Sequence, residues 1–298
     1  MERAYSYQVT VIGGDARQLE VARALSALYK KVGIFGHPSQ SLSDSVELVS
    51  GLSEAVMDTE IIILPISGMD DQGLVRSYQA DEFIDFGSCF QKLTEKTLLV
   101  TGQLSSKWLQ TAKEMRIDVL QYADDDEIAI LNSIPTAEGA VQIAIEKLPI
   151  TIHGSRVVVI GFGRVGATTA RMFKSLGARV IVSARRGALL ARAIELNLET
   201  VWQRDLVQAL PSADIIINTV PARVLGRSEL AEISQEALII DLSSPPGGTD
   251  FEEAERLKLK AILAPGLPGK VASKTAGKIL ASAIPRLIAD FKNGGGWK

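Results

Sequence analysis

A glycine-rich stretch in the middle of the chain carries the clearest chemical signal in the sequence. Residues 157–160 are apolar and predict a buried parallel strand, and a helical pattern follows after three glycines in G-x-G-x-x-G spacing. The first glycine allows a tight turn, the second lets the backbone approach a pyrophosphate, and the third lets helix and strand pack closely. We therefore predict a dinucleotide-binding turn rather than an empty glycine-rich loop, formed by Gly161, Phe162, Gly163, Arg164, Val165 and Gly166.

The strand after this turn indicates which dinucleotide is bound. In an NAD-binding domain an Asp or Glu stands at the end of that strand, about 20 residues past the motif, and holds the ribose 2′-hydroxyl. Ser183 stands there instead, with Arg185 and Arg186 close behind it. Guanidinium groups would bind a 2′-phosphate that a carboxylate would repel. We therefore expect NADP; the alternative is that one arginine covers the adenine and the other is solvated.

Two more apolar strands, at 214–218 and 238–241, end in loops that should lie beside the ribose and nicotinamide. Open α/β sheets bind ligands at the carboxyl ends of their strands. The residues predicted to contact the cofactor there are Thr219, Val220, Pro221 and Leu242.

The N-terminal third repeats the strand-helix-strand plan without the third glycine. Strands are predicted at 9–12 and 32–35, with a helix at about 19–30 between them. We expect a Rossmann-like domain that does not bind the nucleotide in the usual way. Arg17, beside the helix N-terminus, could clamp a carboxylate, and Asp15 could accept a proton. The alternative is that Arg17 pairs with Asp15 as a structural cap.

Further strands alternate with helices along this part of the chain, which predicts a parallel sheet. The predicted strands are 60–64, 97–101 and 117–120, and the predicted helices are 82–93 and 106–115. Ser67, just after the first of these strands, is a candidate substrate contact. Its alternative role is hydrogen bonding within the loop.

A Pro-containing segment should lead into the second domain. Residues 127–131 alternate in polarity and predict a strand that Pro135 stops, followed by a helix at about 137–147. Ser133, Thr136 and Glu138 would lie at the start of that helix as candidate substrate contacts, with Glu138 also a candidate proton acceptor. Alternatively, Thr136 and Glu138 only cap the helix.

A loop rich in Pro and Gly near the C-terminus carries Lys270 and Lys274 and precedes an apolar helix. We predict an α/β protein of two Rossmann-like parallel-sheet domains with a cleft between them. Residues 1–134 form the first domain, residues 135–274 the NADP-binding domain, and the C-terminal segment 275–298 packs back on the first.

Composition narrows the function classes. The 298 residues carry a net charge of −3 and one cysteine, which gives no basic field for nucleic acid and no Cys-based metal site. No apolar run approaches membrane-spanning length and no signal peptide is visible, so we expect a cytoplasmic protein. Cys89 is predicted to be a buried structural thiol, His37 a loop residue, and His153 a structural hydrogen-bonding residue.

Five stretches together resemble the family of the dipicolinate synthase A subunit, whose members make pyridine-2,6-dicarboxylate during endospore formation. They are VIGGDARQLE at 11–20, NSIPTAEG at 132–139, TIHGS at 151–155, DLSSPPGGTDF at 241–251 and LAPGLPGKVASKTAG at 263–277. The resemblance implies NADP-linked oxidation of dihydrodipicolinate, a branch from the lysine pathway, and the flavoprotein-like B subunit of dipicolinate synthase in the role of partner. We also expect a homo-oligomer.

The residues fit a dianionic substrate. Arg17, Lys270 and Lys274 are cationic groups on both sides of the predicted cleft. The candidates for the proton acceptor are Lys270, Glu138 and Asp15, with His153 or water as alternatives.

Two other functions compete with this one. A D-2-hydroxyacid dehydrogenase would need a histidine after the nucleotide-binding turn, and residues 154–298 contain none. A non-catalytic NADP-binding protein with a regulatory or scaffold role is the other alternative.

Overall fold

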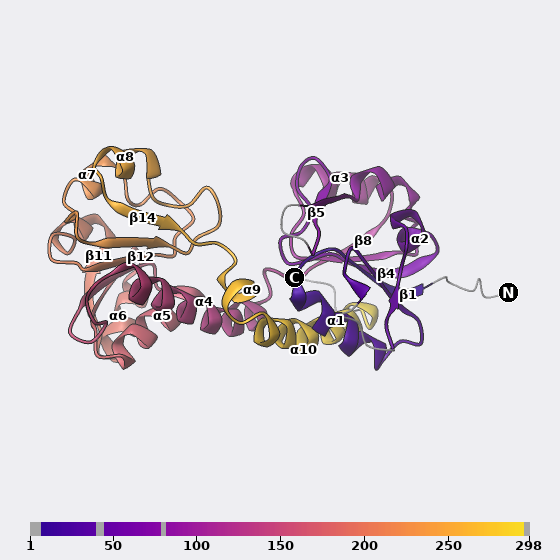
Figure 1. Ribbon diagram of the computed structural model, residues 1–298, viewed down its shortest axis with the longest axis horizontal. Helices are drawn as coiled ribbons and strands as arrows, with labels where there is room; N and C mark the ends of the chain where they lie inside the picture. The colour runs from indigo at the N-terminus through magenta and orange to yellow at the C-terminus, as the bar shows by residue number, and fades with distance from the viewer. Residues whose placement is uncertain (1–6, 40–44, 79–81, 295–298) are drawn as a thin grey trace. The chain divides into compact units, whose positions relative to one another are not determined.

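The protein folds into two compact α/β units, each built on a six-stranded parallel sheet (Figure 1). The computed structural model describes residues 7–39, 45–78 and 82–294. Unit 1 comprises residues 1–129 and 272–298, and unit 2 comprises residues 130–271. The predicted fold class, two Rossmann-like parallel-sheet domains, is confirmed.

The sheet of unit 1 has the strand order β3-β2-β1-β4-β7-β8, and its strands pair in parallel. An antiparallel pair, β5 with β6, lies outside it. The strands are β1 (Tyr7–Ile12), β2 (Val32–Phe35), β3 (Glu47–Leu48), β4 (Thr59–Ile63), β5 (Leu74–Arg76), β6 (Phe83–Asp85), β7 (Leu98–Thr101) and β8 (Asp118–Gln121).

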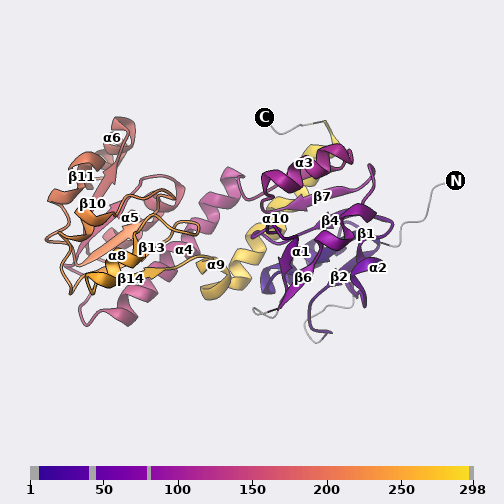
Figure 2. The ribbon, with the colours of Figure 1, turned by 90° about the horizontal axis from the view of Figure 1, so that it is seen from above.

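Helices cover both faces of this sheet. Those of unit 1 are α1 (Ala16–Ser26), α2 (Leu52–Val56), α3 (Ser106–Glu114) and α10 (Ser273–Lys292), with a 3-10 helix η2 (Gly87–Lys92). Helices α1 and α10 lie side by side under one face, and α2 and α3 cover the other (Figures 1 and 2). The contact between α1 and α10 is very close at Gly277, where a Cβ atom would lie 3.1 Å from the Cα of Arg17.

Unit 2 repeats the same plan with the strand order β11-β10-β9-β12-β13-β14. This is the doubly wound order in which the crevice between the first and fourth strands, here β9 and β12, receives a ligand. The strands are β9 (Arg156–Ile160), β10 (Arg179–Ala184), β11 (Glu199–Trp202), β12 (Ile215–Asn218), β13 (Leu238–Asp241) and β14 (Lys260–Leu263).

The helices of unit 2 also lie on both faces of the sheet (Figure 1). Helices α4, α5 and α6 pack on one face, while α7, α8 and the 3-10 helix η3 pack on the other. The helices are α4 (Asp126–Lys147), α5 (Arg164–Ser175), α6 (Gly187–Glu195), α7 (Arg227–Leu230), α8 (Phe251–Arg256) and α9 (Leu267–Val271), with η3 at Gln203–Gln208.

Helix α4 corrects the prediction for the segment that joins the units. Residues 127–131 are helical and not a strand, and Pro135 lies inside the helix instead of ending a strand. Side chains of Ser133, Ala137 and Ala140 are buried at helical spacing, so tertiary packing outweighs the cost of a proline in the helix.

The predicted helix at 82–93 is also wrong. Strand β6 and helix η2 occupy that segment. Gly87 packs against Gly73 so closely that a Cβ on Gly87 would lie 3.0 Å from the Cα of Gly73, and the backbone N–H of Gly87 donates to the carbonyl of Gly73. This contact and the edge-to-face pair of Phe86 and Phe90 favour the compact turn over a regular helix. Cys89 is buried, as predicted.

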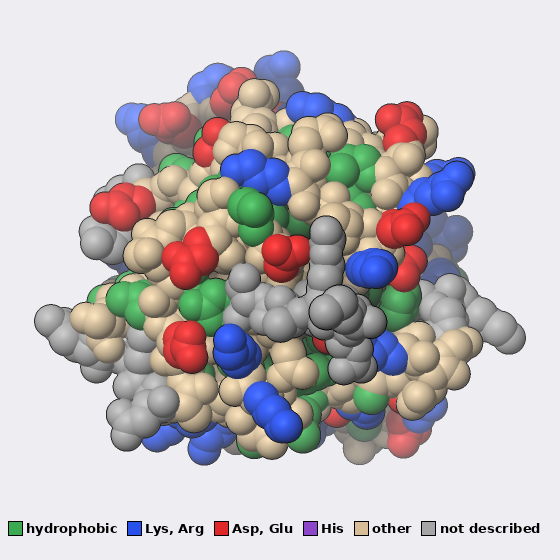
Figure 3. Space-filling view, turned by 90° about the vertical axis from the view of Figure 1, so that its right-hand side faces the viewer, with side chains coloured by type: hydrophobic (Ala, Val, Ile, Leu, Met, Phe, Trp, Pro, Cys, Tyr) green, Lys and Arg blue, Asp and Glu red, His purple; other side chains and the backbone are tan. Residues whose placement is uncertain are grey.

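Among the described residues, α4 is long and apolar enough to cross a membrane, judged by length and composition alone. Ile128 of this helix lies in a core of unit 1 and Ala140 and Ala144 lie in a core of unit 2, whereas Ile130, Ile134 and Ile145 are exposed. The face of unit 1 drawn in Figure 3 intersperses acidic and basic side chains without a large patch of one sign.

Candidate functional site

The glycine-rich turn between β9 and α5 has the geometry that its spacing predicts. Gly161 has φ +92°, a left-handed conformation, and a Cβ there would lie 2.5 Å from Oγ1 of Thr219. A Cβ on Gly166 would collide with the carbonyl oxygen of Gly161, so glycine is required for the helix to approach the strand. At Gly163, the N-cap of α5, a Cβ would meet nothing within 4 Å, so this side of the turn is open.

The turn opens onto a pocket of about 360 Å³ at the carboxyl end of the sheet. Eleven of the residues predicted to contact the cofactor line it: Gly161, Phe162, Gly163, Arg164, Val165, Gly166, Arg185, Arg186, Thr219, Val220 and Pro221. Ala184, Leu189 and Gln203 complete the lining and were not predicted. The lining thus includes three arginines and no acidic residue, which makes the pocket suited to an anion.

Two predicted cofactor residues, Ser183 and Leu242, lie outside this lining. The side chain of Ser183 is fully buried, and its hydroxyl has no hydrogen-bond partner. Strand β10 extends one residue beyond the predicted end, so Ala184 and not Ser183 occupies the pocket wall. The position just before Arg185 therefore carries a methyl group where an NAD-binding domain would carry a carboxylate.

A buried carboxylate that was not predicted from the sequence holds the loops beyond the pocket. Asp241, the last residue of β13, is fully buried and accepts hydrogen bonds from Ser243, Asn218, Gly248 and Thr249. Burial opposes its ionisation, but the hydrogen bonds from Ser243, Asn218 and Thr249 outweigh burial and lower the pKa of Asp241. The sequence pattern does not reveal this burial, because a polar residue at the end of an apolar strand is usually an exposed loop residue.

In unit 1, the predicted alternative for Arg17 is the arrangement observed. The guanidinium donates to both oxygens of Asp15, each at 2.8 Å, and Asp15 also caps α1 by accepting from the backbone N–H of Arg17. Burial of Asp15 opposes its ionisation, but the hydrogen bonds and charge of Arg17 prevail and lower its pKa. The carboxylate of Asp15 thus occupies the N-terminus of α1.

His37 lies in a loop, as predicted, but its burial and its contacts were not predicted. Its side chain is buried, and Nε2 lies 2.7 Å from the carbonyl oxygen of Gly13. Because a carbonyl only accepts, Nε2 carries the proton and donates. Burial lowers the pKa of His37, against the smaller opposing effects of Gly13 and Asp15, so the neutral form is favoured.

The hydroxyls predicted to contact substrate from α4 are used within the protein. Ser133 is almost fully buried and bonds to Thr168 and to the carbonyl of Ile130, each at 2.6 Å. Thr136 donates to the carbonyl of Asn132 one turn earlier. It does not cap the helix, because α4 begins well before it, at Asp126. The remaining candidates, Ser67, Glu138, Lys270 and Lys274, are exposed.

Family models match both parts of the chain. The model for the N-terminal domain of the dipicolinate synthase A subunit matches residues 8–123. The model described as "D-isomer specific 2-hydroxyacid dehydrogenase, NAD binding domain" matches residues 136–244, a range that contains the whole pocket lining. The pocket of unit 2 is therefore a site for a nicotinamide dinucleotide, and the match supports an oxidoreductase.

Relatives are similar over almost the whole chain. The chain is 38% identical to the dipicolinate synthase A subunit of Bacillus subtilis (strain 168), covering 96% of this chain and 97% of that protein. The crystal structure of the dipicolinate synthase A subunit from Bacillus halodurans has 39% identity and a TM-score of 0.87, covering 96% of this chain and 98% of that one. The crystal structure of the Bacillus subtilis protein has 36% identity and a TM-score of 0.86, covering 98% of both chains.

The open side of the turn at Gly163 predicts a loss of cofactor binding in Gly163→Asp. The fold should tolerate the change, since a Cβ has space there, but the carboxylate would meet the pyrophosphate. We expect the dissociation constant of the dinucleotide, measured by calorimetry, to rise by roughly a hundredfold or more. Gly163→Ala, which adds only a methyl group, should weaken binding far less. Unchanged affinity in Gly163→Asp would remove the turn from the site.

The lowered pKa of His37 predicts a stability that falls as the solution becomes more acidic. Between the folded pKa and the unfolded value of 6.5, the unfolded chain binds more protons, so acid favours unfolding in that window. His37→Gln, which can still donate to Gly13, should show a smaller drop in melting temperature between about pH 7.5 and pH 5.5. An unaltered slope in His37→Gln would contradict this assignment.

Proposed function

Because this chain belongs to the family of the dipicolinate synthase A subunit, we propose that it is an NADP-dependent dehydrogenase that oxidises dihydrodipicolinate to dipicolinate. The observation that carries the proposal is the composition of the pocket in unit 2. Three arginines line it, no carboxylate does, and Ala184 stands before Arg185 and Arg186 at the end of β10.

The choice of NADP rests on charge and hydrogen bonding. Arg185 and Arg186 are exposed beside the pocket, where their guanidinium groups can bind a 2′-phosphate through paired, charge-assisted hydrogen bonds. An NAD-specific site would instead use a carboxylate to accept from the 2′-hydroxyl. The methyl group of Ala184 leaves room for the phosphate and adds no repulsion.

The reaction removes a hydride and a proton from two bonded carbon atoms of the ring and leaves an aromatic pyridine. When bound, the nicotinamide ring supplies the hydride acceptor. Aromatisation makes the oxidation favourable, so the protein mainly orients the ring and accepts a proton. Lys270 and Glu138 are the candidates for the proton acceptor. Asp15 is the weaker candidate, because Arg17 holds its pKa low.

The substrate carries two carboxylates, and the proposed contacts are cationic or hydroxyl groups. Arg17 lies at the N-terminus of α1 with 13% of its side chain exposed, and Lys274 lies exposed in the first turn of α10. Ser67 lies exposed in the turn after β4. Arg17 has five N–H donors and uses two on Asp15, so its guanidinium retains donors for a carboxylate.

The relatives carry the name of one subunit of a synthase, and we propose the flavoprotein-like B subunit of dipicolinate synthase for the partner, in the cytoplasm of a sporulating cell. Self-association of the chain is proposed as well. A D-2-hydroxyacid dehydrogenase is less suitable, because residues 154–298 contain no histidine to accept a hydroxyl proton.

Arg185 and Arg186 should determine the preference for NADP. We expect the double variant Arg185→Ala with Arg186→Ala to raise the dissociation constant of NADP by roughly tenfold to a hundredfold, through lost charge-assisted hydrogen bonds, and that of NAD by less than about threefold. Calorimetry with both dinucleotides measures the difference. Arg192→Ala removes an exposed arginine that pairs with Glu195 on α6 and serves as the control. Equal losses for NADP and NAD would refute the 2′-phosphate assignment.

The proposed reaction is tested by absorbance of NADPH with purified protein, NADP and enzymatically generated dihydrodipicolinate. We expect NADPH to form without a partner protein. Arg17→Ala should raise the KM by roughly tenfold or more if a charge-assisted contact to a substrate carboxylate is lost.

Asp15→Asn separates the two roles of Arg17, because it weakens the ion pair but keeps the guanidinium. It should leave the KM nearer to the wild-type value than Arg17→Ala does. Arg23→Ala, on the same helix and paired with Glu20, is the matched control. If the protein binds the cofactor but turns over substrate only when a second protein is added, the non-catalytic alternative is favoured.

A further inference from the structure

The buried carboxylate of Asp241 joins two loops into one structure next to the pocket. Its Oδ1 accepts from the backbone N–H and the hydroxyl of Ser243, at 3.0 and 2.6 Å. Its Oδ2 accepts from Nδ2 of Asn218, the N–H of Gly248 and the hydroxyl of Thr249, at 2.9, 2.9 and 2.8 Å. Five donors point at this carboxyl group, which suits the ionised form because that form has no donor of its own.

Asn218 connects the carboxylate of Asp241 to the wall of the pocket. Its Nδ2 donates to the carbonyl of Val220 at 3.1 Å, and its Oδ1 accepts from the N–H of Val220 at 3.0 Å. One side chain therefore holds both backbone polar groups of a residue that lines the pocket. Without Asp241, the Nδ2 of Asn218 would lose its hydrogen bond to the carboxylate, which helps to fix the orientation of this amide.

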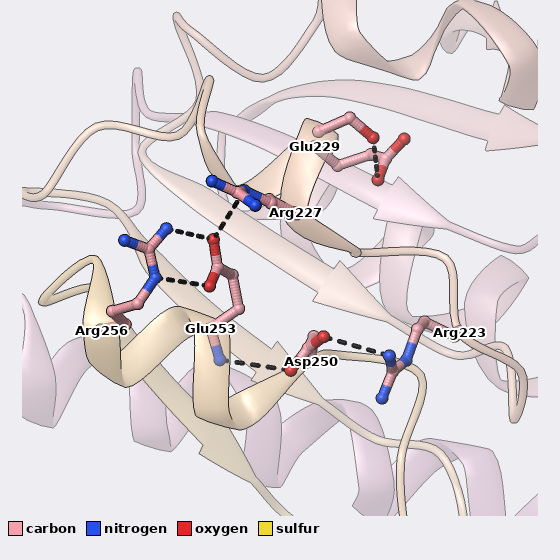
Figure 4. Close-up of polar contacts among 7 residues, drawn as sticks. Arg223, Arg227, Glu229, Asp250, Glu253 and Arg256 are labelled. Atoms are coloured by element: carbon pink, nitrogen blue, oxygen red, sulfur yellow. Dashed lines mark hydrogen bonds and ion pairs between the residues drawn. The ribbon is translucent and has the colours of Figure 1, made fainter.

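The loop after β13 also binds the loop after β12 directly. The N–H groups of Val224 and Leu225 donate to the carbonyl of Gly248, and the N–H of Asp250 donates to the carbonyl of Leu225. A Cβ on Gly248 would lie 2.5 Å from Nδ2 of Asn218, so the loops touch at a position that only glycine allows. At the exposed rim, Arg223 pairs with Asp250 at 3.1 Å (Figure 4).

The strand order assigns this wall to one half of the cofactor. The pyrophosphate belongs over the turn after β9, and Arg185 and Arg186 follow β10 on one side of it. Strand β12, followed by Thr219 and Val220, lies on the other side. A dinucleotide that lies across the carboxyl ends of the strands puts its adenosine over β10 and its nicotinamide over β12.

We propose that Asp241 and Asn218 are positioning residues for the nicotinamide half of the cofactor. They act through the backbone of Val220, while the adenosine half is bound independently by the end of β10. The inference rests on the dinucleotide site and the sheet order, and it holds for NADP and for NAD alike.

The test compares whole dinucleotides with fragments that lack only the nicotinamide ring, on the full chain. Calorimetry measures dissociation constants for NADP and NAD and for the fragments 2′-phospho-ADP-ribose and ADP-ribose. In Asp241→Asn, an NH2 group replaces one acceptor, so Asn218 and its partners lose their fixed arrangement. We expect both dinucleotides to bind about tenfold more weakly, and both fragments to keep their affinity within about threefold.

Milder variants keep the test decisive if Asp241→Asn fails to fold. Thr249→Val removes one donor to Asp241 with little change in shape, and it should weaken the dinucleotides about threefold without affecting the fragments. Ser155→Ala is the control, since it removes a buried hydroxyl at the opposite end of β9 that donates to Ile152. It should change neither set.

Two outcomes would overturn the proposal. If the variants weaken dinucleotides and fragments by the same factor, the network has a general structural role. If the affinity of the dinucleotides is unchanged, the wall does not position the nicotinamide. The fragments bind at β10 whichever dinucleotide is preferred, so an error in the assignment of NADP does not affect the comparison.

Discussion

The close contact between α5 and β9 is the constraint on which the pocket of unit 2 depends. The Cα of Gly166 lies so near the carbonyl of Gly161 that any side chain would separate helix and strand. The contact directs the N-terminus of α5, the positive end of its helix dipole, at the crevice beside β12. Thr219, which follows the neighbouring strand β12, ties that strand to β9, because its hydroxyl donates to the carbonyl of Ile160 at 2.9 Å.

The two units share a strand order but use the N-terminus of their first helix differently. In unit 2, the N-cap of α5 is Gly163, and the helix faces an open, arginine-lined pocket. In unit 1, the carboxylate of Asp15 occupies the N-terminus of α1 and is neutralised by Arg17. A phosphate at that position would have to displace this carboxylate from the backbone N–H of Arg17.

Charge is distributed within unit 2 so that a buried anion stabilises the loops while cations face the solvent. Asp241 is buried and fully hydrogen-bonded, which lowers its pKa despite burial. Arg185 and Arg186 remain exposed at the pocket. The buried carboxylate fixes the backbone at the ends of β12 and β13, and the exposed arginines remain available to an anionic ligand.

Local patterns along the chain were enough to predict the fold class and a nicotinamide-dinucleotide cofactor, the resemblance of five stretches to a known family predicted the family, and all three predictions are confirmed. Apolar strands alternating with helices are local signals, and the glycines at 161, 163 and 166 form a short, fixed spacing that can be recognised within six residues. Only folding in three dimensions settled the continuous helix α4 through Pro135, the pairing of Arg17 with Asp15, the burial of His37 and the contacts of Asp241. These features depend on packing and on partners brought together from distant positions, such as Asn218 and Asp241 on neighbouring strands, and the spacing of residues along the chain does not encode such partners.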